Sequence, residues 1–269
     1  MLRFGSMPPT DFLHRDVQAF GKRAFRLGLS ASFGLDDSGV RAAIDRGMNY
    51  FFFNRAVWGR MGPGLRDAMK RDREKIIVAS GPSIGFFGGS VRRGLEKVLK
   101  TLGTDYLDVY QLFWLGVGSA WNDATVAELV KLREEGKVRA IGVSIHDRAR
   151  AGRLAEDSPL DLFMIRYNAA HPGAERDIFP HLEKRHPAVI AYTATSWRRL
   201  LKRPRGWDGP VMTAGDCYRY VLSDPHVDVA LCGPSGVAQL DENLRALERG
   251  PLSDEERSWM TRFGHAVHG

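Results

Sequence analysis

Polar side chains that could move a proton stand directly after several apolar runs of the sequence. Asn54 and Arg55 follow one such run, and His146 follows another. An imidazole titrates near neutral pH, so His146 is a candidate general acid, and a water molecule held by Asn54 and Arg55 is a second candidate. A single histidine after a strand is also a common surface or helix-capping residue, so both interpretations stay open. Comparable positions after a later run are held by Arg166, Asn168 and His171.

Aromatic side chains gather in the same parts of the sequence. They occur at Phe52, Phe53, Trp58 and Phe113, and two more tryptophans, Trp197 and Trp207, lie in a long segment later in the chain. Such a cluster can simply fill space, or it can hold a flat or cationic ligand by stacking and cation–π contact. The two interpretations stand side by side.

Short β-rich runs alternate with amphipathic helical segments over most of the 269 residues. The runs are nearly continuous in apolar residues, which is typical of parallel strands covered on both faces. This alternation predicts one domain, residues 1–269, folded as a (β/α)8 TIM barrel. An open doubly wound sheet would favour a Gly-x-Gly-x-x-Gly turn after the first strand, and none occurs. The predicted strands are Phe25–Ser30, Asn49–Phe53, Lys75–Ser80, Tyr106–Phe113, Arg139–Ser144, Leu162–Tyr167, Val189–Thr193 and Val227–Cys232.

Three additions to a minimal barrel are expected. Residues Asp16–Arg23 predict an N-terminal hairpin that closes the bottom of the barrel. The long segment Arg198–Pro210, rich in Arg, Trp, Gly and Pro, is typical of a loop over the mouth. Ser253-Asp-Glu-Glu256 matches a capping box, which predicts an extra C-terminal helix reaching about Phe263.

The composition favours a soluble, cytoplasmic protein. The chain is 43% hydrophobic but has no apolar run of membrane-spanning length, so no membrane partner is expected. Its 39 basic and 32 acidic residues give a net charge of +7. The basic residues are scattered, which disfavours a specific nucleic-acid partner. Their densest group, Arg198 to Arg205, forms either a solvated surface or a contact for an anionic ligand. Two cysteines without metal-ligand spacing predict neither a disulfide scaffold nor a metal site.

Several motifs resemble those of the aldo-keto reductase family, in the family's order, over about Val17 to Leu252. Gly47-Met-Asn-Tyr-Phe-Phe-Phe-Asn-Arg-Ala-Val-Trp-Gly59 is similar to the family's second strand. The segment Leu102–Leu112 is similar to the fourth strand and its lead-in helix, and Leu132–Ser144 to the fifth unit. Tyr167-Asn168 and Gln239-Leu-Asp-Glu-Asn243 complete the set. The resemblance implies the barrel fold and a site at the carboxyl ends of its strands.

The resemblance also implies that the catalytic tetrad of the family is replaced in this chain. The family reduces carbonyls with an Asp, a Tyr, a Lys and a His. The Asp column falls on Phe53, or on Phe52 in the alternative alignment, and the Tyr column falls on Trp58. The Lys and His columns hold Gly81 and Phe113. Conventional carbonyl reduction is therefore not expected.

The resemblance also implies positions that would hold a nicotinamide nucleotide, and more of these than of the catalytic positions keep a residue suited to the role. Met164, however, replaces the glutamine that meets the carboxamide, and no Lys or Arg occurs between Leu231 and Asn243 for a 2′-phosphate. Arg198 or Arg199 could substitute from the long loop. NADP, NAD and no cofactor at all therefore stay open. The implied nucleotide-binding residues are Ser144, Tyr192, Gly233, Ser235, Gly236, Glu242 and Asn243.

Three functions follow from these observations. The first is a pseudoenzyme of the aldo-keto reductase type that binds a small molecule. The second is an active NAD(P)H-dependent oxidoreductase with a rebuilt proton relay through His146, or through a water molecule held by Asn54 and Arg55. The third is a non-redox barrel enzyme, a lyase or cyclase, whose aromatic pocket holds the substrate.

Overall fold

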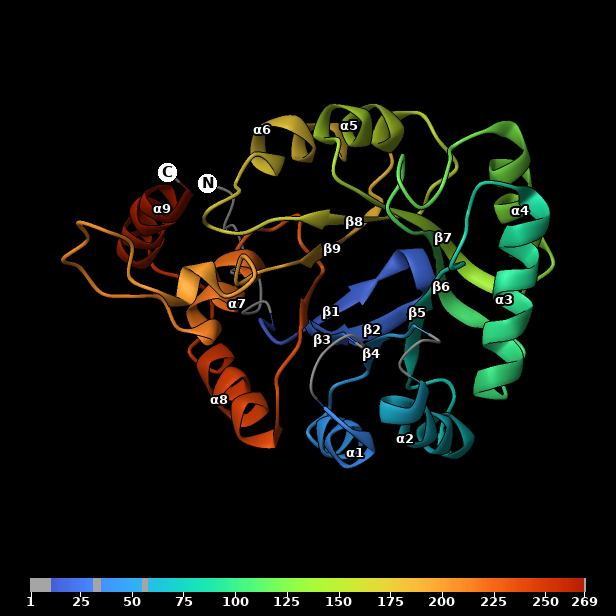
Figure 1. The fold of residues 1–269 in the computed structure, drawn as a ribbon, viewed down its shortest axis with the longest axis horizontal. Coiled ribbons are helices and arrows are strands. Elements are labelled where there is room, and N and C mark those ends of the chain that lie inside the picture. The colour runs from blue at the N-terminus through green and yellow to red at the C-terminus, as the bar shows by residue number, and fades with distance from the viewer. Residues whose placement is uncertain (1–10, 31–34, 55–57, 269) are drawn as a thin grey trace, which may run out of the picture.

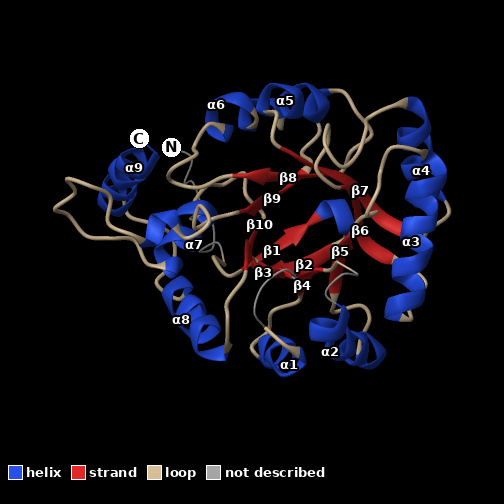
Figure 2. Cartoon of the chain, in the orientation of Figure 1, coloured by secondary structure: helices blue, strands red, loops and turns tan. Residues whose placement is uncertain are grey.

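The computed structural model describes residues 11–30, 35–54 and 58–268. Within these residues, strands β3 to β10 form a closed parallel barrel in which β10 pairs with both β9 and β3. Helices surround this barrel, as Figures 1 and 2 show. The predicted (β/α)8 architecture is confirmed. The barrel strands are β3 (Leu27–Ser30), β4 (Tyr50–Phe52), β5 (Ile77–Ser80), β6 (Leu107–Leu112), β7 (Val138–Ile145), β8 (Leu162–Arg166), β9 (Ala188–Tyr192) and β10 (Val229–Cys232).

The connections are mostly helical and follow local sequence signals. The Thr213 hydroxyl accepts from the Asp216 N–H, and the Asp216 carboxylate accepts from the Thr213 N–H, which begins α7 with a capping box. The left-handed Gly103 ends α3. The helices are α1 (Asp37–Asp45), α2 (Trp58–Arg71), α3 (Gly88–Leu102), α4 (Asp123–Glu134), α5 (Arg148–Glu156), α6 (Ala174–Asp177), α7 (Ala214–Leu222), α8 (Val237–Leu247) and α9 (Asp254–His268).

The expected C-terminal helix is α9, and it begins with the predicted capping box. The N–H of Ser253 donates to the carboxylate of Glu256, and the N–H of Glu256 donates to the hydroxyl of Ser253. The helix continues to His268, beyond the predicted end near Phe263. The extra turn has a packing reason, since Val267 is buried against the core.

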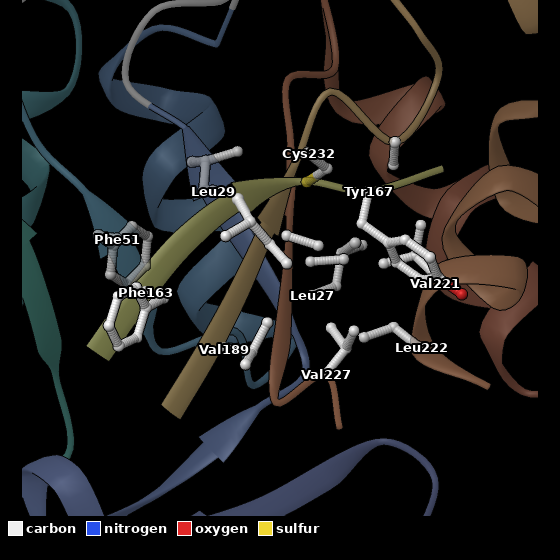
Figure 3. Close-up of a cluster of buried hydrophobic side chains, with 14 of the residues drawn as sticks. Leu27, Leu29, Phe51, Phe163, Tyr167, Val189, Val221, Leu222, Val227 and Cys232 are labelled. Carbon is white, nitrogen blue, oxygen red and sulfur yellow. The ribbon is translucent and has the colours of Figure 1, made fainter. Parts of the chain in front are cut away.

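The outer faces of the strands and the inner faces of the helices form the larger core. Leu27 and Leu29 of β3, Val189 of β9, and Val221 and Leu222 of α7 belong to this layer (Figure 3). These side chains are almost fully buried, and each contributes roughly 1.5–3 kcal/mol relative to an exposed position. Burial on both faces explains why the strands read as continuous apolar runs.

The predicted N-terminal hairpin consists of β1 (His14–Val17) and β2 (Lys22–Phe25), joined by a short turn of 3-10 helix. Its apolar residues Val17, Phe20 and Ala24 contact side chains at the start of the barrel strands. The rings of Phe20 and Tyr50, for example, lie 6.1 Å apart. The hairpin therefore closes the amino-terminal end of the barrel and leaves the carboxyl end for a site.

A charged network reinforces the closed end. The carboxylate of Asp108 is fully buried, and its Oδ2 lies 2.9 Å from Nη2 of Arg73. The Lys22 Nζ lies 2.8 Å from Oδ1 of Asp108, an ion pair whose angle falls short of a well-formed hydrogen bond. The guanidinium of Arg73 also stacks over the Tyr106 ring at 3.9 Å. Asp108 thus ties the hairpin to the strands β5 and β6.

Candidate functional site

Every second residue of a barrel strand points into the barrel. The buried side chains that pack together inside the barrel, here called the inner core, show which residues these are. Ile77 and Ala79 of β5 belong to this inner core, as do Leu162 and Met164 of β8 and Ile190 of β9. Because side chains alternate along a strand, the next members of these series face inward at the carboxyl end. We call this ring the mouth, and its members include Gly81, Phe113, Ser144, Arg166, Tyr192 and Gly233.

A cavity of about 780 Å³ opens at one side of the mouth, which is a volume suited to a small organic ligand or cofactor. Its walls come from the ends of β9 and β10, the segment 193–201 and the first two turns of α7 and α8. Several of the residues predicted to hold a nucleotide line it together: Tyr192, Gly233, Ser235, Glu242 and Asn243. Segments far apart in the sequence are therefore brought to one place by the barrel closure between β9 and β10.

The remaining two predicted nucleotide-binding residues lie elsewhere. The hydroxyl of Ser144 accepts a hydrogen bond from the N–H of Trp114 at 2.7 Å, so this serine fixes the loop after β6. Gly236 is the residue before α8 and has an extended backbone. It provides no side chain for the first turn of that helix, and the nearby Gln239 carboxamide accepts from the N–H of Ser235 at 2.9 Å. The free N–H groups of α8 thus begin beside the cavity and favour an anion there.

The long segment after β9 divides into two parts. Trp197, Arg198 and Leu201 line the cavity, as expected for a loop over the mouth. The later part turns away, because the Trp207 ring packs edge-on against Phe263 of α9 with centroids 5.3 Å apart. The expectation that both Trp197 and Trp207 belong to one aromatic cluster is therefore wrong for Trp207. Arg199 is also drawn away, since its guanidinium donates to the Val267 carbonyl at 2.9 Å.

Aromatic rings occupy the β4–β6 side of the mouth. The rings of Phe52 and Phe113 lie 5.4 Å apart, and Phe52 also lines the cavity. Phe53 is fully buried in the outer core, so its side chain points away from the mouth. Of the two residues expected at the family's aspartate position, Phe52 is the one that faces the mouth. Arg55 and the side chain of Trp58 lie outside the described residues, and Asn54 is half-buried just after β4.

Gly81 leaves no room for a longer side chain at its position. A Cβ added there would lie 2.1 Å from the carbonyl oxygen of Gln111 and 2.7 Å from the ring of Phe113. Real Cβ atoms do not approach this closely, and a backbone oxygen cannot move aside as a flexible side chain can. Phe113 fills the space that a lysine at position 81 would need.

His146 and Tyr192 form a hydrogen-bonded pair at the rim. The hydroxyl of Tyr192 lies 3.0 Å from Nε2 of His146, and Trp114 stands next to the imidazole with ring centroids 6.3 Å apart. Burial and the nearby Arg166 charge lower the pKa of His146, which keeps its imidazole neutral. Burial raises the pKa of Tyr192 to about 12. A phenol and a neutral imidazole in contact can pass a proton between them.

The other polar candidates have different surroundings. The carboxamide of Asn168 is buried, donates to the Thr193 carbonyl at 2.8 Å and accepts from the Ala170 N–H at 3.0 Å. It holds the ends of β8 and β9 together and is a structural residue. His171 contacts Asn168 and the ring of His268 on α9. Its pKa is lowered to about 4 by burial and by Arg166.

Sequence reasoning did not assign several residues of the cavity. Thr193, Met212 and Tyr218 line it, as does the buried Cys232, whose pKa burial raises to about 12. Met212 and Tyr218 enter because the long segment returns to the mouth before α7, which no local pattern indicates. The inward series Val229, Leu231, Gly233 could have placed Leu231 here, since it follows from the strand period alone.

Within the described residues, no group of His, Cys, Asp and Glu side chains is arranged to hold a metal ion. Among the same residues, no helix is long and apolar enough to cross a membrane.

Comparisons with known proteins agree with this fold. A sequence model of the Aldo/keto reductase family matches residues 38–204. The uncharacterized oxidoreductase YqkF of Bacillus subtilis is 24% identical over 284 residues, which cover 90% of this chain and 90% of the relative. The methylglyoxal reductase YeaE of Escherichia coli is 32% identical over 131 residues, covering 47% of this chain and 45% of that protein. The holo form of aldo-keto reductase AKR11C1 from Bacillus halodurans superposes with a TM-score of 0.77 at 21% identity, over 93% of this chain and 95% of that one.

Proposed function

Because the chain belongs to the Aldo/keto reductase family, we propose that it binds a nicotinamide nucleotide at the mouth but does not reduce carbonyls by the family's tyrosine-based route. The observation that carries the proposal is the packing at Gly81. The Gln111 carbonyl and the Phe113 ring occupy the space that a catalytic lysine would need.

The cavity beside β9 and β10 supports the binding half of the proposal. Its volume and its mixed polar and apolar walls fit a nucleotide. The free N–H groups at the start of α8 would bind a phosphate, and the Tyr192 ring would stack on the nicotinamide. Glu242 and Asn243 would meet the adenine end. A reduced nicotinamide, when bound, supplies a hydride.

The mouth supports the catalytic half. A positioned general acid contributes about 10²- to 10⁴-fold to a rate, so a site without one is slow even with a bound hydride donor. At the mouth, the described inward residues on the side of β4 to β6 are Phe52, Gly81 and Phe113, and none of these three has an ionisable group. Rings in these positions also avoid the desolvation of a buried Asp–Lys pair.

Titration with NADPH and with NADH tests the binding half. Trp197 lines the cavity, so its fluorescence should be quenched as either nucleotide binds. Saturation in the micromolar range is expected. No binding at millimolar nucleotide would discard this half of the proposal. Measured carbonyl reduction faster than roughly 1 s⁻¹, the low end of ordinary turnover, would discard the catalytic half.

The contact between His146 and Tyr192 favours a second candidate, an NAD(P)H-dependent oxidoreductase with a rebuilt proton relay. In this function the Tyr192 hydroxyl donates the proton to the developing alkoxide, and His146 holds and replenishes it. His146→Ala would then abolish turnover while the affinity for the nucleotide stays unchanged. Turnover that survives in this variant would remove His146 from the role.

A further inference from the structure

Arg166 is a charged side chain in an unusual place. It is the last residue of β8 and continues the inward series of Leu162 and Met164, so it faces the mouth. It is half-buried, unlike a solvated surface arginine. Its strand register pairs it with Tyr192 of β9. The guanidinium therefore lies at the rim of the barrel, on the β7–β8 side of Tyr192.

Neighbouring side chains enclose Arg166 without neutralising it. The hydroxyl of Tyr192, at the end of β9, contacts the imidazole of His146, which follows β7. Since β8 lies between these two strands, the contact spans the end of β8, where Arg166 is located. His171 lies in the segment that follows β8, five residues after Arg166. Both histidines have pKa values lowered by burial first and by Arg166 next, so they are uncharged at neutral pH.

No carboxylate offsets the charge of Arg166 in the part of the chain that the structure describes. Its guanidinium has no ion pair and no hydrogen bond there. The nearby cation Arg148 is already paired, since its Nε lies 2.8 Å from Asp177. Arg199 and His268, which also lie near His171, carry no carboxylate. A half-buried guanidinium with five donors and no acceptor is set up to receive an anion.

The side of the mouth across from Arg166 is apolar. Phe52 and Phe113 form an apolar wall on β4 and β6, and Trp114 extends that wall to His146. The walls of the nucleotide cavity include Met164 and Tyr192 but not Arg166. A ligand at the mouth would thus have its anionic end beside Arg166 and its apolar body against the rings, next to the bound nucleotide.

We propose that Arg166, flanked by His146 and His171, is the binding site for the anionic group of a small organic acid, a carboxylate or a phosphate ester, that enters the mouth. The inference rests on the proposed small-molecule function and specifies the class of the second ligand. Arg166 is the specificity residue, because it supplies the charge, and the imidazoles supply neutral hydrogen-bond donors that an anion accepts.

Binding of simple probes to the full chain without nucleotide tests the proposal. Benzoate carries a carboxylate on an aromatic ring, benzamide has the same shape without the charge, and inorganic phosphate represents the other anion. The imidazole NMR signals of His146 and His171 report occupancy directly. We expect benzoate to bind saturably and benzamide to bind more weakly. The relative affinities of benzoate and phosphate decide which anion the site prefers.

Two variants assign the effect to Arg166. Arg166→Gln should weaken the binding of the preferred anion about tenfold or more, since a charge-assisted hydrogen bond is lost. Arg153→Gln makes the same charge change on an exposed face of α5 and should bind like the wild type. Arg166→Lys keeps the charge and should recover part of the affinity, which separates binding from any folding defect in the glutamine variant.

The proposal is overturned if Arg166→Gln binds the anions as tightly as the wild type, or if benzamide matches benzoate. It is also overturned if neither benzoate nor phosphate saturates at tens of millimolar. Titration of the same proteins with NADPH distinguishes this outcome from failure of the nucleotide proposal. Anion binding that depends on Arg166 in a protein that binds no nucleotide would leave only the present inference standing.

Discussion

Gly81 faces the main-chain carbonyl of Gln111 so closely that even a methyl group between them would lie 2.1 Å from the oxygen. Gly81 directly follows β5 and Gln111 lies in the neighbouring strand β6, so relief would require the two strand ends to move apart. We therefore expect Gly81→Ala to lower the free energy of unfolding by about 1–3 kcal/mol, as overpacking in a core does. Urea denaturation measures the change.

The matched control is Gly89→Ala, because Gly89 is an exposed glycine in the first turn of α3 with only the end of the Arg93 side chain nearby. Alanine is the better helix former by up to about 1 kcal/mol, so this variant should be neutral or more stable. If both alanine variants were equally stable, the packing argument at Gly81 would fail. Gly81→Lys should be at least as destabilised as Gly81→Ala and should not restore carbonyl reduction.

The ion pair between Lys22 and Asp108 predicts a large effect at the closed end of the barrel. Lys22→Met removes one of the cations that compensate the fully buried carboxylate. Breaking such a pair should cost about 3 kcal/mol, and Asp108→Asn in the same background should recover part of it. Lys75→Met is the control, since the ion pair of Lys75 with Asp72 is exposed and worth at most about 1 kcal/mol. Equal losses in the two lysine variants would contradict the prediction.

His171 predicts a pH dependence of stability. Its pKa in the folded protein is about 4, below its ordinary value of 6.5, because of burial first and the Arg166 charge next. The unfolded chain therefore binds more protons between these values, and stability is lost as the pH falls through that window. His171→Gln should lose less stability than the wild type over the same fall. Denaturation at the two ends of the window measures this difference, and His265→Gln on the exposed face of α9 is the control. A parallel loss in all three proteins would rule out the contribution of His171.

The positions of Arg198 and Arg199 predict which of the two affects the affinity for a nucleotide with a 2′-phosphate. Arg198 lines the cavity, whereas the guanidinium of Arg199 is engaged with the Val267 carbonyl. If NADPH binds, Arg198→Gln should weaken it about tenfold through the lost charge and leave NADH unchanged. Arg199→Gln should alter neither affinity. An equal loss of NADH and NADPH affinity in Arg198→Gln would mean that Arg198 meets a phosphate common to both.

The fold was predictable because its signals are local. Parallel strands are buried on both faces and read as apolar runs, so Leu162–Tyr167 predicted β8 (Leu162–Arg166) and Val189–Thr193 predicted β9 (Ala188–Tyr192) to within a residue. The capping residues Ser253 and Glu256 predicted the start of α9, because a capping box is also a local pattern. Its end was less predictable, since α9 is extended by the packing of Val267 against the core.

The site was predictable in position but not in detail. Tyr192 and Glu242 were predicted to lie at one site, and the barrel brings them to one cavity, while their role in nucleotide binding stays a prediction. The sequence could not show which of Phe52 and Phe53 faces the mouth. Side chains alternate along a strand, but a run made only of aromatic residues does not indicate which ones point inward. The missing partner of Arg166 is a tertiary property, and no spacing in the sequence encodes it.

The charged network around Asp108 has a consequence for how this protein can change over evolutionary time. The network and the hairpin secure the amino-terminal end of the barrel, whereas the cavity and the mouth lie at the carboxyl end. Side chains of the mouth such as Phe52, Phe113 and Arg166 are thus separated from the Asp108 network and the hairpin. Because the two ends are separate, the residues of the site can change in evolution, and its chemistry with them, while the contacts at the closed end of the barrel are kept.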